Sequence, residues 1–346
     1  MNHYSEKENL QKANIQVRGL EISPPLLLAP MAGLTHSALR TTIQSCGGIG
    51  LLSTEMLAAW RLPNENATVS PFLFRTKSEK PLSYQILIND VSQLEPAVQA
   101  LHRLQADAID INIGCPAPRV RKAGGGSALV EKPQLLRDIL SRARNITEGP
   151  LTAKIRLGDG NEAVLKPFCQ MLVDQGVDML SIHARLQGES FARKPHWSMI
   201  AEIKKWVNVP VIANGGIDSV NTARACLDQS GADGLMIGRA AAAKPWLFAE
   251  IARDLYNEKG LDTNYSKVEL YNQFCKALNE RFRIERRLGR LKEFTHYFAT
   301  NYAYGHHLAS KVQASNTMEQ AVERAQHFFS VHDPEGFARV WSQPAD

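Results

Sequence analysis

The sequence predicts an α/β fold, a (β/α)8 TIM barrel followed by an all-α helical bundle. Short apolar runs alternate with segments of helical periodicity up to about residue 260. Each run is continuously apolar, as is typical of parallel strands covered on both faces. The 23 glycines and 17 prolines fall mostly before residue 261, so turns are frequent before that point and rare after it. Eight strand–helix repeats favour a closed barrel over an open sheet.

The expected strands are residues 26–29, 49–53, 82–86, 108–112, 151–155, 179–183, 209–213 and 234–237. The expected helices are residues 35–46, 91–105, 132–145, 162–175, 197–207, 218–229 and 245–257. Thr35 and Asp218 are suitable N-cap residues, because their side-chain oxygens can accept backbone N–H groups. Residues 61–80 lack helical periodicity and are expected to form a long loop after the second strand.

Three segments follow from this pattern. Residues 1–20 are expected to be an N-terminal extension, residues 21–260 a catalytic barrel and residues 261–346 a helical domain. About four helices are expected in the last segment, beginning near Ser266, Leu288 or Lys292, Thr317 and Pro334.

The composition excludes several classes of protein. With 44% hydrophobic residues, 22% charged residues and a net charge of +5, the chain is neither disordered nor strongly cationic. The longest apolar run, around residues 26–34, is far shorter than the about 20 residues of a membrane-spanning helix. The N-terminus lacks the apolar stretch of a secretory signal. The five cysteines are widely spaced without a C-x-x-C motif, so no metal site and a reducing, cytoplasmic location are expected.

Reactive and polar residues gather where the expected strands end. In TIM barrels the functional residues follow the C-terminal ends of the strands. These positions hold, strand by strand, Pro30, Met31 and Ala32; Glu55; Gln85; Asn112 and Cys115; Lys154 and Arg156; His183 and Arg185; Asn214, Gly215 and Gly216; and Gly238 and Arg239. A barrel that served only as a scaffold would have no reason to collect them on one rim.

The last two strand ends predict a phosphate site. TIM barrels often bind phosphate between these two loops. Gly215, Gly216 and Gly238 let backbone N–H groups approach an anion, and Arg239 adds a guanidinium. The alternative is two ordinary glycine turns.

Three further rim residues have alternative roles. Lys154 lies in an apolar strand, where an unpaired charge is costly. It is therefore expected to face a ligand acceptor such as a flavin pyrimidine edge, or to pair with Glu55 or another rim carboxylate. Gln85 can hydrogen-bond a flat heterocycle or be a satisfied core glutamine. His183 is expected in the site because Lys154 and Asn112 lie on neighbouring strands.

Cys115 begins a stiff, basic loop that ends in three glycines at 124–126, which suits a lid over an anionic substrate. A cysteine thiol of ordinary pKa, about 8.5, is mostly protonated at neutral pH and can act as a general acid. Arg119, Arg121 and Lys122 would instead favour the thiolate if they came close. The other four cysteines are expected to be small buried residues.

Seven segments in order carry a family resemblance: LAPMAG (28–33), DINIGCP (110–116), GGGSAL (124–129), TAKIRLG (152–158), SIHARLQG (181–188), PVIANGGI (210–217) and LMIGRAAAAKPW (235–246). They resemble the tRNA-dihydrouridine synthase family. Ala184 and Leu186 depart from the family's usual H-G-R-T, and Gly216 stands where an acid is usual. The GGG at 124–126, the QG at 187–188 and the HW at 196–197 are more similar to the bacterial C-type subfamily.

The resemblance implies bound FMN, with NADPH or NADH as a diffusible reductant. Carried over by position, the flavin ring lies near Pro30, Met31, Ala32, Gln85, Lys154 and His183, and the phosphate near Asn214, Gly215, Gly216, Gly238 and Arg239. No G-x-G-x-x-G motif occurs, so the reductant would visit the flavin directly.

The resemblance also implies the reaction. Uracil C6 would accept hydride from the flavin, and Cys115 would donate a proton to C5. Asn112, His183 and Arg185 would hydrogen-bond uracil or stabilise the charge that develops on O4. The nucleotide would have to be turned out of folded tRNA into the pocket, with Arg119, Arg121 and Lys122 beside it.

A basic stripe marks the helical segment. Arg281, Arg283, Arg286, Arg287, Arg290 and Lys292 lie within twelve residues that contain one acid, Glu285. Such a stripe is expected to contact tRNA phosphates, the alternative being a solvated helix face. Phe294, Tyr297 and Phe298 have the i, i+3, i+4 spacing of core packing rather than base stacking.

Two other functions remain open from the sequence. One is an FMN-dependent reductase of a free pyrimidine or small enone, which resembles dihydroorotate dehydrogenases. The other is a non-catalytic RNA-binding protein. A monomer that binds one tRNA, with no membrane and no metal as partner, is the expected state.

Overall fold

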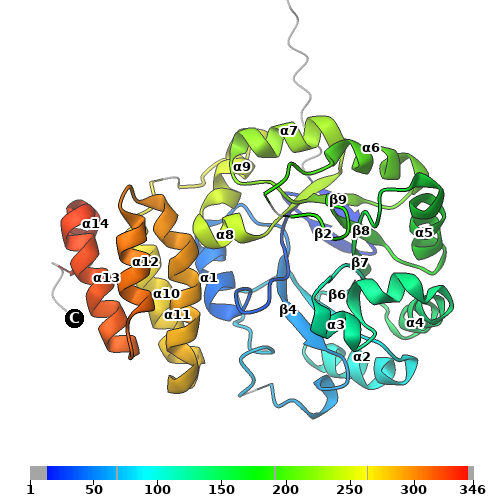
Figure 1. Cartoon of the computed structure of the whole chain (residues 1–346), viewed down its shortest axis with the longest axis horizontal. Coiled ribbons are helices and arrows are strands. Elements are labelled where there is room, and N and C mark those ends of the chain that lie inside the picture. Colours follow the sequence, from blue (N-terminus) through cyan, green and yellow to red (C-terminus); the bar gives the residue numbers. More distant parts are fainter. Residues whose placement is uncertain (1–13, 68, 191, 263, 342–346) are drawn as a thin grey trace, which may run out of the picture.

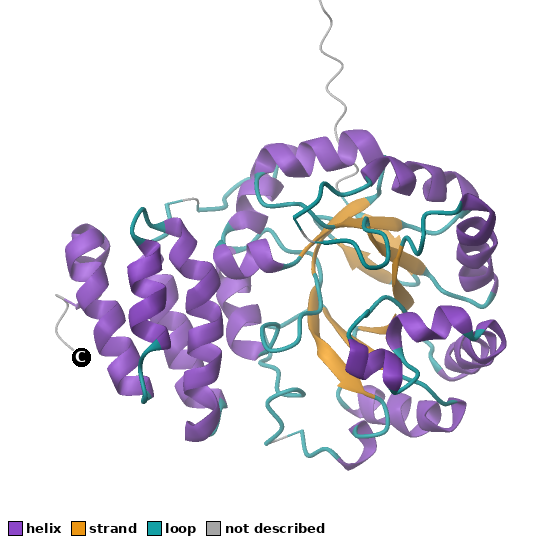
Figure 2. Cartoon of the chain, in the orientation of Figure 1, coloured by secondary structure: helices purple, strands orange, loops and turns teal. Residues whose placement is uncertain are grey.

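A computed structural model describes residues 14–341 except 68, 191 and 263. Eight parallel strands form its centre, and helices surround them (Figures 1 and 2). The strands are β3 (Leu26–Leu28), β4 (Leu52–Ala58), β5 (Leu82–Leu87), β6 (Ala108–Asn112), β7 (Leu151–Arg156), β8 (Met179–His183), β9 (Val211–Asn214) and β10 (Gly234–Ile237). Their order is β3-β10-β9-β8-β7-β6-β5-β4, and a parallel bridge between Leu27 and Leu51 closes the circle. The predicted TIM barrel with a helical region is confirmed.

The second strand is longer than its apolar pattern predicted. It was expected at residues 49–53, but β4 continues to Ala58 through a register shift between Ser53 and Met56. The buried polar residues Thr54 and Glu55 interrupt the apolar run, which is why the pattern ended early.

Helices cover the outside of the barrel. They are α1 (Ser37–Cys46), α2 (Leu94–Arg103), α4 (Pro133–Ile146), α5 (Glu162–Asp174), α6 (Trp197–Trp206), α7 (Val220–Ser230), α8 (Arg239–Ala243) and α9 (Leu247–Tyr256), with the short α3 (Pro118–Lys122) after β6.

Both predicted N-caps are wrong. The N-cap of α1 is His36, because the Thr35 hydroxyl is held by the backbone of Met31. The N-cap of α7 is Ser219, which forms a capping box with Thr222 one residue after Asp218.

An N-terminal hairpin closes the bottom of the barrel. Residues 1–20 were expected to be an extension; residues 1–13 lie outside the described part, but β1 (Ile15–Val17) and β2 (Leu20–Ile22) form an antiparallel pair. The buried side chains of these two strands pack against the barrel interior in one apolar cluster: Ile15, Val17, Ile22, Leu27, Ala29, Leu51, Met179, Ile212 and Met236.

The helical region packs against one side of the barrel (Figure 1). Its described part contains five helices: α10 (Lys267–Arg281), α11 (Ile284–Phe298), α12 (Gly305–Gln313), α13 (Met318–His332) and α14 (Pro334–Trp341). Four were expected, because the polar α12 was not recognised. Phe294 and Phe298 are fully buried, as predicted, and Phe294 stacks on Phe274 with ring centroids 3.8 Å apart.

The long loop after β4 is tied to both parts of the molecule. Its Glu79 and Arg40 of α1 form an ion pair at 2.6 Å, with both side chains fully buried. Glu79 also accepts from Ser37 at 2.5 Å. Arg281 of α10 donates to the Ser37 carbonyl at 2.9 Å and to Thr41 at 2.7 Å. One polar cluster therefore joins the loop, α1 and the helical region.

Among the described residues we searched for membrane-spanning helices and for clusters of metal ligands. None of their helices is both long and apolar enough to cross a membrane. Nor do any three of their His, Cys, Asp or Glu side chains gather as metal ligands.

Candidate active site

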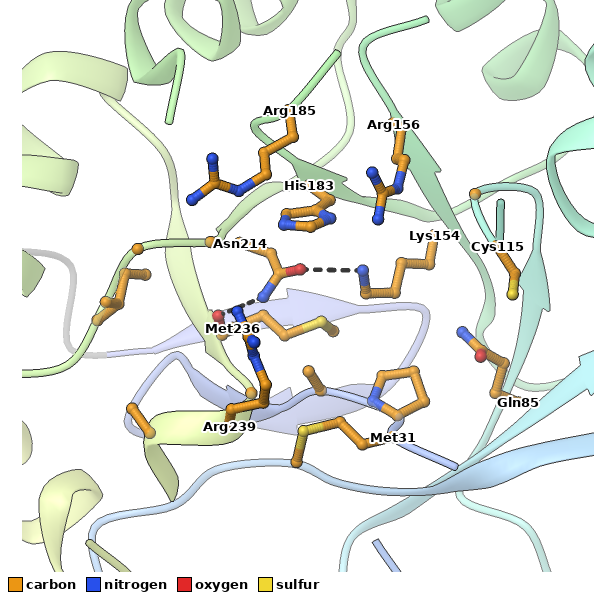
Figure 3. Close-up of a pocket in the computed structure, with 18 of the residues that line it drawn as sticks. Met31, Gln85, Cys115, Lys154, Arg156, His183, Arg185, Asn214, Met236 and Arg239 are labelled. Atoms are coloured by element: carbon orange, nitrogen blue, oxygen red, sulfur yellow. Dashed lines mark hydrogen bonds between the residues drawn. The ribbon is translucent and has the colours of Figure 1, made fainter. Parts of the chain in front are cut away.

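A cavity of about 570 Å³ opens at the C-terminal ends of the barrel strands. It is within the size range of small-molecule and cofactor sites. Of the residues predicted for the site, those that line it are Pro30, Met31, Gln85, Asn112, Cys115, Lys154, His183, Arg185, Asn214, Gly215, Gly216, Gly238 and Arg239. Figure 3 shows Cys115 and Gln85 at one end of the cavity and Arg239 at the other, with Lys154, His183 and Asn214 between them.

Lys154 is held by an amide rather than by a carboxylate. Its Nζ donates to Asn214 Oδ1 at 2.9 Å, and Asn214 Nδ2 donates to the Met236 carbonyl at 2.8 Å (Figure 3). Burial lowers the pKa of Lys154 to about 8, against the attraction of Asp110, which raises it. The alternative of a Lys154–Glu55 pair is wrong, because Glu55 Oε2 instead accepts from the Gly33 N–H at 2.6 Å.

The cavity wall is cationic. Among the described side chains that line it, four are Lys or Arg (Lys154, Arg156, Arg185 and Arg239), and one, Asp218, is a carboxylate. His183 lies among these cations, and burial together with Lys154, Arg156, Arg185 and Arg239 lowers its pKa to about 2. His183 is therefore neutral at physiological pH and offers one N–H and one acceptor nitrogen. Such a wall suits an anionic ligand.

A buried hydrogen-bond chain supports the Cys115 loop. Gln85 Nε2 donates to Asp110 at 2.6 Å, while its Oε1 accepts from Asn112 at 2.7 Å. Asn112 Oδ1 in turn accepts the backbone N–H of Cys115 at 2.9 Å. Thr152 donates to the other oxygen of Asp110 at 2.6 Å. Gln85 thus has the partners of a satisfied core glutamine, although its side chain also borders the cavity.

The basic loop residues lie outside the cavity wall. Arg119, Arg121 and Lys122 belong to α3, and Arg121 pairs with Glu131 at 2.7 Å. Arg119 and Lys122 are exposed. The cations that line the cavity together with Cys115 are instead Lys154, Arg156, Arg185 and Arg239.

The glycines of the predicted phosphate site have conformations that require glycine. Gly215 and Gly216 have φ of +111° and +73°, and a Cβ at Gly215 would lie 2.8 Å from the His183 ring. The Gly215 carbonyl accepts from Trp197 Nε1 at 2.9 Å, which fixes this turn. Beside Gly238, Met31 is held by its backbone N–H, which donates to the Thr35 hydroxyl at 2.9 Å. Ala32, which was predicted beside the flavin, is exposed and does not line the cavity.

Among the lining residues, Met56, Met236 and Tyr297 were not predicted, and Arg156 was placed on the rim without a role. Arg156 carried a signal, because it follows Lys154 at i+2 and so lies on the same face of a strand. Asp110 carried one too, as an acid inside the apolar run 108–112. Met56 and Met236 resemble ordinary core residues in sequence. Tyr297 comes from α11. It packs against the core, as its spacing predicted, and it also lines the cavity.

Some arginines of the basic stripe contact other parts of the protein, and others are exposed. Arg281 contacts the barrel, and Arg290 lies over the Phe282 ring at 4.3 Å and donates to the Arg286 carbonyl. Arg287 donates to two backbone carbonyls, those of Asn279 and Phe282. Arg283 and Arg286 are exposed.

Comparisons with known proteins show which proteins the chain is similar to. The model of the family "Dihydrouridine synthase (Dus)" matches residues 27–333. The tRNA-dihydrouridine synthase B of Escherichia coli K12 is 36% identical over 65% of this chain and 70% of its own length. The tRNA-dihydrouridine(16) synthase of Aquipseudomonas alcaligenes is 31% identical over 85% of this chain and 96% of its own length.

Solved structures share the fold at low sequence identity. A 2-naphthoyl-CoA reductase superposes with a TM-score of 0.55 at 12% identity, over 72% of this chain and 53% of that chain. Histamine dehydrogenase from Rhizobium sp. 4-9 superposes with a TM-score of 0.54 at 12% identity, over 72% of this chain and 48% of that chain. The chain spans about half of each of these longer proteins, so the likeness concerns the barrel fold alone.

Proposed function

Since the chain belongs to the dihydrouridine synthase (Dus) family, we propose that it is a tRNA-dihydrouridine synthase that reduces the C5=C6 bond of a uridine in the tRNA D-loop. As a member of this family the chain is a flavin-dependent oxidoreductase. The finer proposal is that its flavin is FMN, that NADPH or NADH is the reductant, and that it works in the cytoplasm as a monomer.

The observation that carries the proposal is the layout of the cavity. Arg239 and the glycines at one end offer a guanidinium and close backbone approach to a phosphate, whereas Cys115 at the other end offers a proton. Lys154 lies between them, where its positive charge would face the acceptor atoms of a flavin ring. The cationic wall and the volume of about 570 Å³ fit an FMN molecule with a turned-out base beside it.

The residues that line the cavity have separate proposed roles in the reduction of uridine. Reduced FMN, when bound, supplies the hydride that uracil C6 accepts because the C5=C6 bond is conjugated with the C4 carbonyl. Cys115 donates the proton that C5 needs, so uridine gains one hydride and one proton while NADPH becomes NADP⁺. Asn112 positions Cys115 by accepting its backbone N–H. Arg185 and neutral His183 are candidates to stabilise negative charge on O4.

The relatives also bear on the subfamily. Bacterial B-type synthases match the chain at 35–36% identity, whereas the sequence motifs suggested the C type. Those motifs have local structural roles, since Trp197 donates to the Gly215 carbonyl and His196 pairs with Glu189 at 3.1 Å. The A. alcaligenes relative, whose match extends through the helical region, is named for position 16. Uridine 16 is therefore the first position to examine.

The tRNA is proposed to lie across the mouth of the cavity and the exposed basic residues around it. Arg119 and Lys122 on α3, and Arg283 and Arg286 on α11, are exposed cations available for phosphates. Arg121, Arg287 and Arg290 already bond to other groups of the protein, and they are proposed to contribute less to tRNA binding.

The decisive experiment compares substrates. Purified protein is expected to carry a flavin absorption spectrum and to consume NADPH with tRNA that lacks dihydrouridine, but not with free uridine. Sequencing-based mapping of dihydrouridine in a deletion strain would name the position. Comparable turnover of free uridine would instead support a small-enone reductase, and a protein that never binds flavin would support a non-catalytic RNA-binding role.

The affinity for FMN is expected to depend on pH through Lys154. Its pKa of about 8 means that the amine is charged below pH 8 and loses its charge as the pH rises further. FMN affinity should therefore be full near pH 7 and decline above pH 8 by about tenfold, the effect of about 1.4 kcal/mol of electrostatic attraction. Flavin fluorescence titrations between pH 7 and 9.5 measure this.

The matched variants are Lys154→Met, which should bind more weakly at pH 7 and show no decline above pH 8, and Lys205→Met, which should behave like the wild type. Lys205 is an exposed lysine paired with Glu202 and lies outside the cavity. A decline of the same size in Lys154→Met would disprove the role of this lysine.

A further inference from the structure

Tyr297 brings the helical region into the wall of the active-site cavity. Among the described residues after residue 260, it alone lines the cavity. It lies on α11 between Phe294 and Phe298, which are fully buried in the helical region, while Tyr297 itself is half-buried. The aromatic side chains of this helix therefore point in two directions, and Tyr297 faces the barrel.

The neighbours of Tyr297 place it at one end of the cavity. Arg239, Ala240 and Ala243 of α8 line the same wall, and Asn301 fixes the two regions together by donating to the Ala243 carbonyl at 2.6 Å. Burial and Glu293 raise the pKa of the Tyr297 phenol, and the positive charge of Arg239 acts on it in the opposite direction. At neutral pH the phenol is therefore protonated and able to donate.

The Tyr297 hydroxyl differs from the other tyrosine hydroxyls that are buried or half-buried in this region. Tyr265 donates to the Cys46 carbonyl at 2.7 Å, Tyr271 bonds Thr295 at 2.8 Å, and Tyr302 donates to Asp333 at 3.2 Å. For Tyr297, by contrast, the described part of the chain provides no hydrogen-bond partner for the hydroxyl. A half-buried phenol that borders a cationic cavity has its donor available for a ligand.

We infer that the Tyr297 hydroxyl donates a hydrogen bond to the phosphate of the bound cofactor, beside Arg239, so that the helical region takes part in retaining FMN. This inference rests on the proposed function. Phosphate oxygens accept several donors at once, and hydrogen bonds to a charged acceptor are stronger than neutral ones. Cys115 lies at the end of the cavity away from Arg239 (Figure 3), and Tyr297 is a neighbour of Arg239 rather than of the proposed proton donor. Tyr297 is thus a cofactor-binding residue.

The test uses the full-length chain, stripped of flavin and titrated with FMN and with riboflavin, which lacks the phosphate. Tyr297→Phe keeps the ring and removes only the hydroxyl, so FMN affinity should fall about tenfold while riboflavin affinity should stay unchanged. Tyr304→Phe is the matched control, because Tyr304 lies on the same region, is 57% exposed and does not line the cavity. It should leave both affinities unchanged, and thermal unfolding should be the same for all three proteins.

Three results would overturn the inference. Equal losses for FMN and riboflavin would mean that Tyr297 acts by packing. Unchanged FMN affinity with a raised KM for tRNA would assign the hydroxyl to the RNA. A wild-type chain that binds neither flavin would remove the proposed function itself, which distinguishes that failure from failure at Tyr297 alone.

Discussion

Replacing Cys115 by alanine is expected to lower turnover with tRNA by about 10²–10⁴-fold, the usual contribution of a general acid. The physical reason is that a hydride added to C6 leaves negative charge at C5 and O4, and protonation of C5 completes the reaction. Cys115 lies on the cavity wall, with its backbone fixed by Asn112 at 2.9 Å. Its thiol is half-buried, whereas the other four cysteines are buried.

Two half-reactions make this test specific. Reduction of bound flavin by NADPH in the absence of tRNA needs no proton from Cys115, so its rate and the flavin spectrum should be unchanged in Cys115→Ala. Cys226→Ala, which removes a buried thiol that does not line the cavity, should keep turnover with tRNA near the wild-type value. Full turnover by Cys115→Ala, or an equal loss in both half-reactions, would contradict the assignment.

The largest effect on stability is expected from Glu79→Gln, which should lower the free energy of unfolding by about 3–5 kcal/mol. Glu79 and Arg40 are both fully buried and lie 2.6 Å apart. The substitution leaves the Arg40 guanidinium buried without a negative charge. It also weakens acceptors used by Ser37 and by the Thr76 backbone. Urea denaturation followed by circular dichroism measures the change.

An exposed pair supplies the control for Glu79. Glu202 pairs with Lys205 at 2.8 Å, with side chains 49% and 66% exposed, so Glu202→Gln should change stability by less than about 1 kcal/mol. The double variant Arg40→Met with Glu79→Met removes both charges and should recover much of the loss. If Glu79→Gln and Glu202→Gln were equally stable, the buried ion pair would have no special role.

The barrel could be predicted because its strands are continuously apolar, and the rim residues followed from the strand ends. The apolar pattern failed to predict strand residues where the buried side chains are polar. Glu55 is 4% exposed and held by the Gly33 N–H, so the extension of β4 carried no apolar signal. The hairpin at Ile15–Ile22 was missed because its strands are only three residues long.

The sequence predicted which residues lie near the site better than it predicted where their side chains point. A sequence shows that Arg121 follows Cys115, but it does not show that the guanidinium turns away to Glu131. Arg290 was grouped with exposed arginines, although it lies over the Phe282 ring. Tyr297 could not be found from its own helix, because the periodicity of α11 gives its packing partners and not the cavity across the junction.

The hairpin that closes the bottom of the barrel has a consequence for the order of events. Ile15, Val17 and Ile22 fill that end together with Met179 and Ile212, so the cavity communicates with solvent at its upper rim. Under the proposed function, the nicotinamide and the uridine would both reach the flavin through this one opening. They would then bind in turn rather than together, and the dinucleotide would have to leave before the RNA base enters, which is the order of a double displacement.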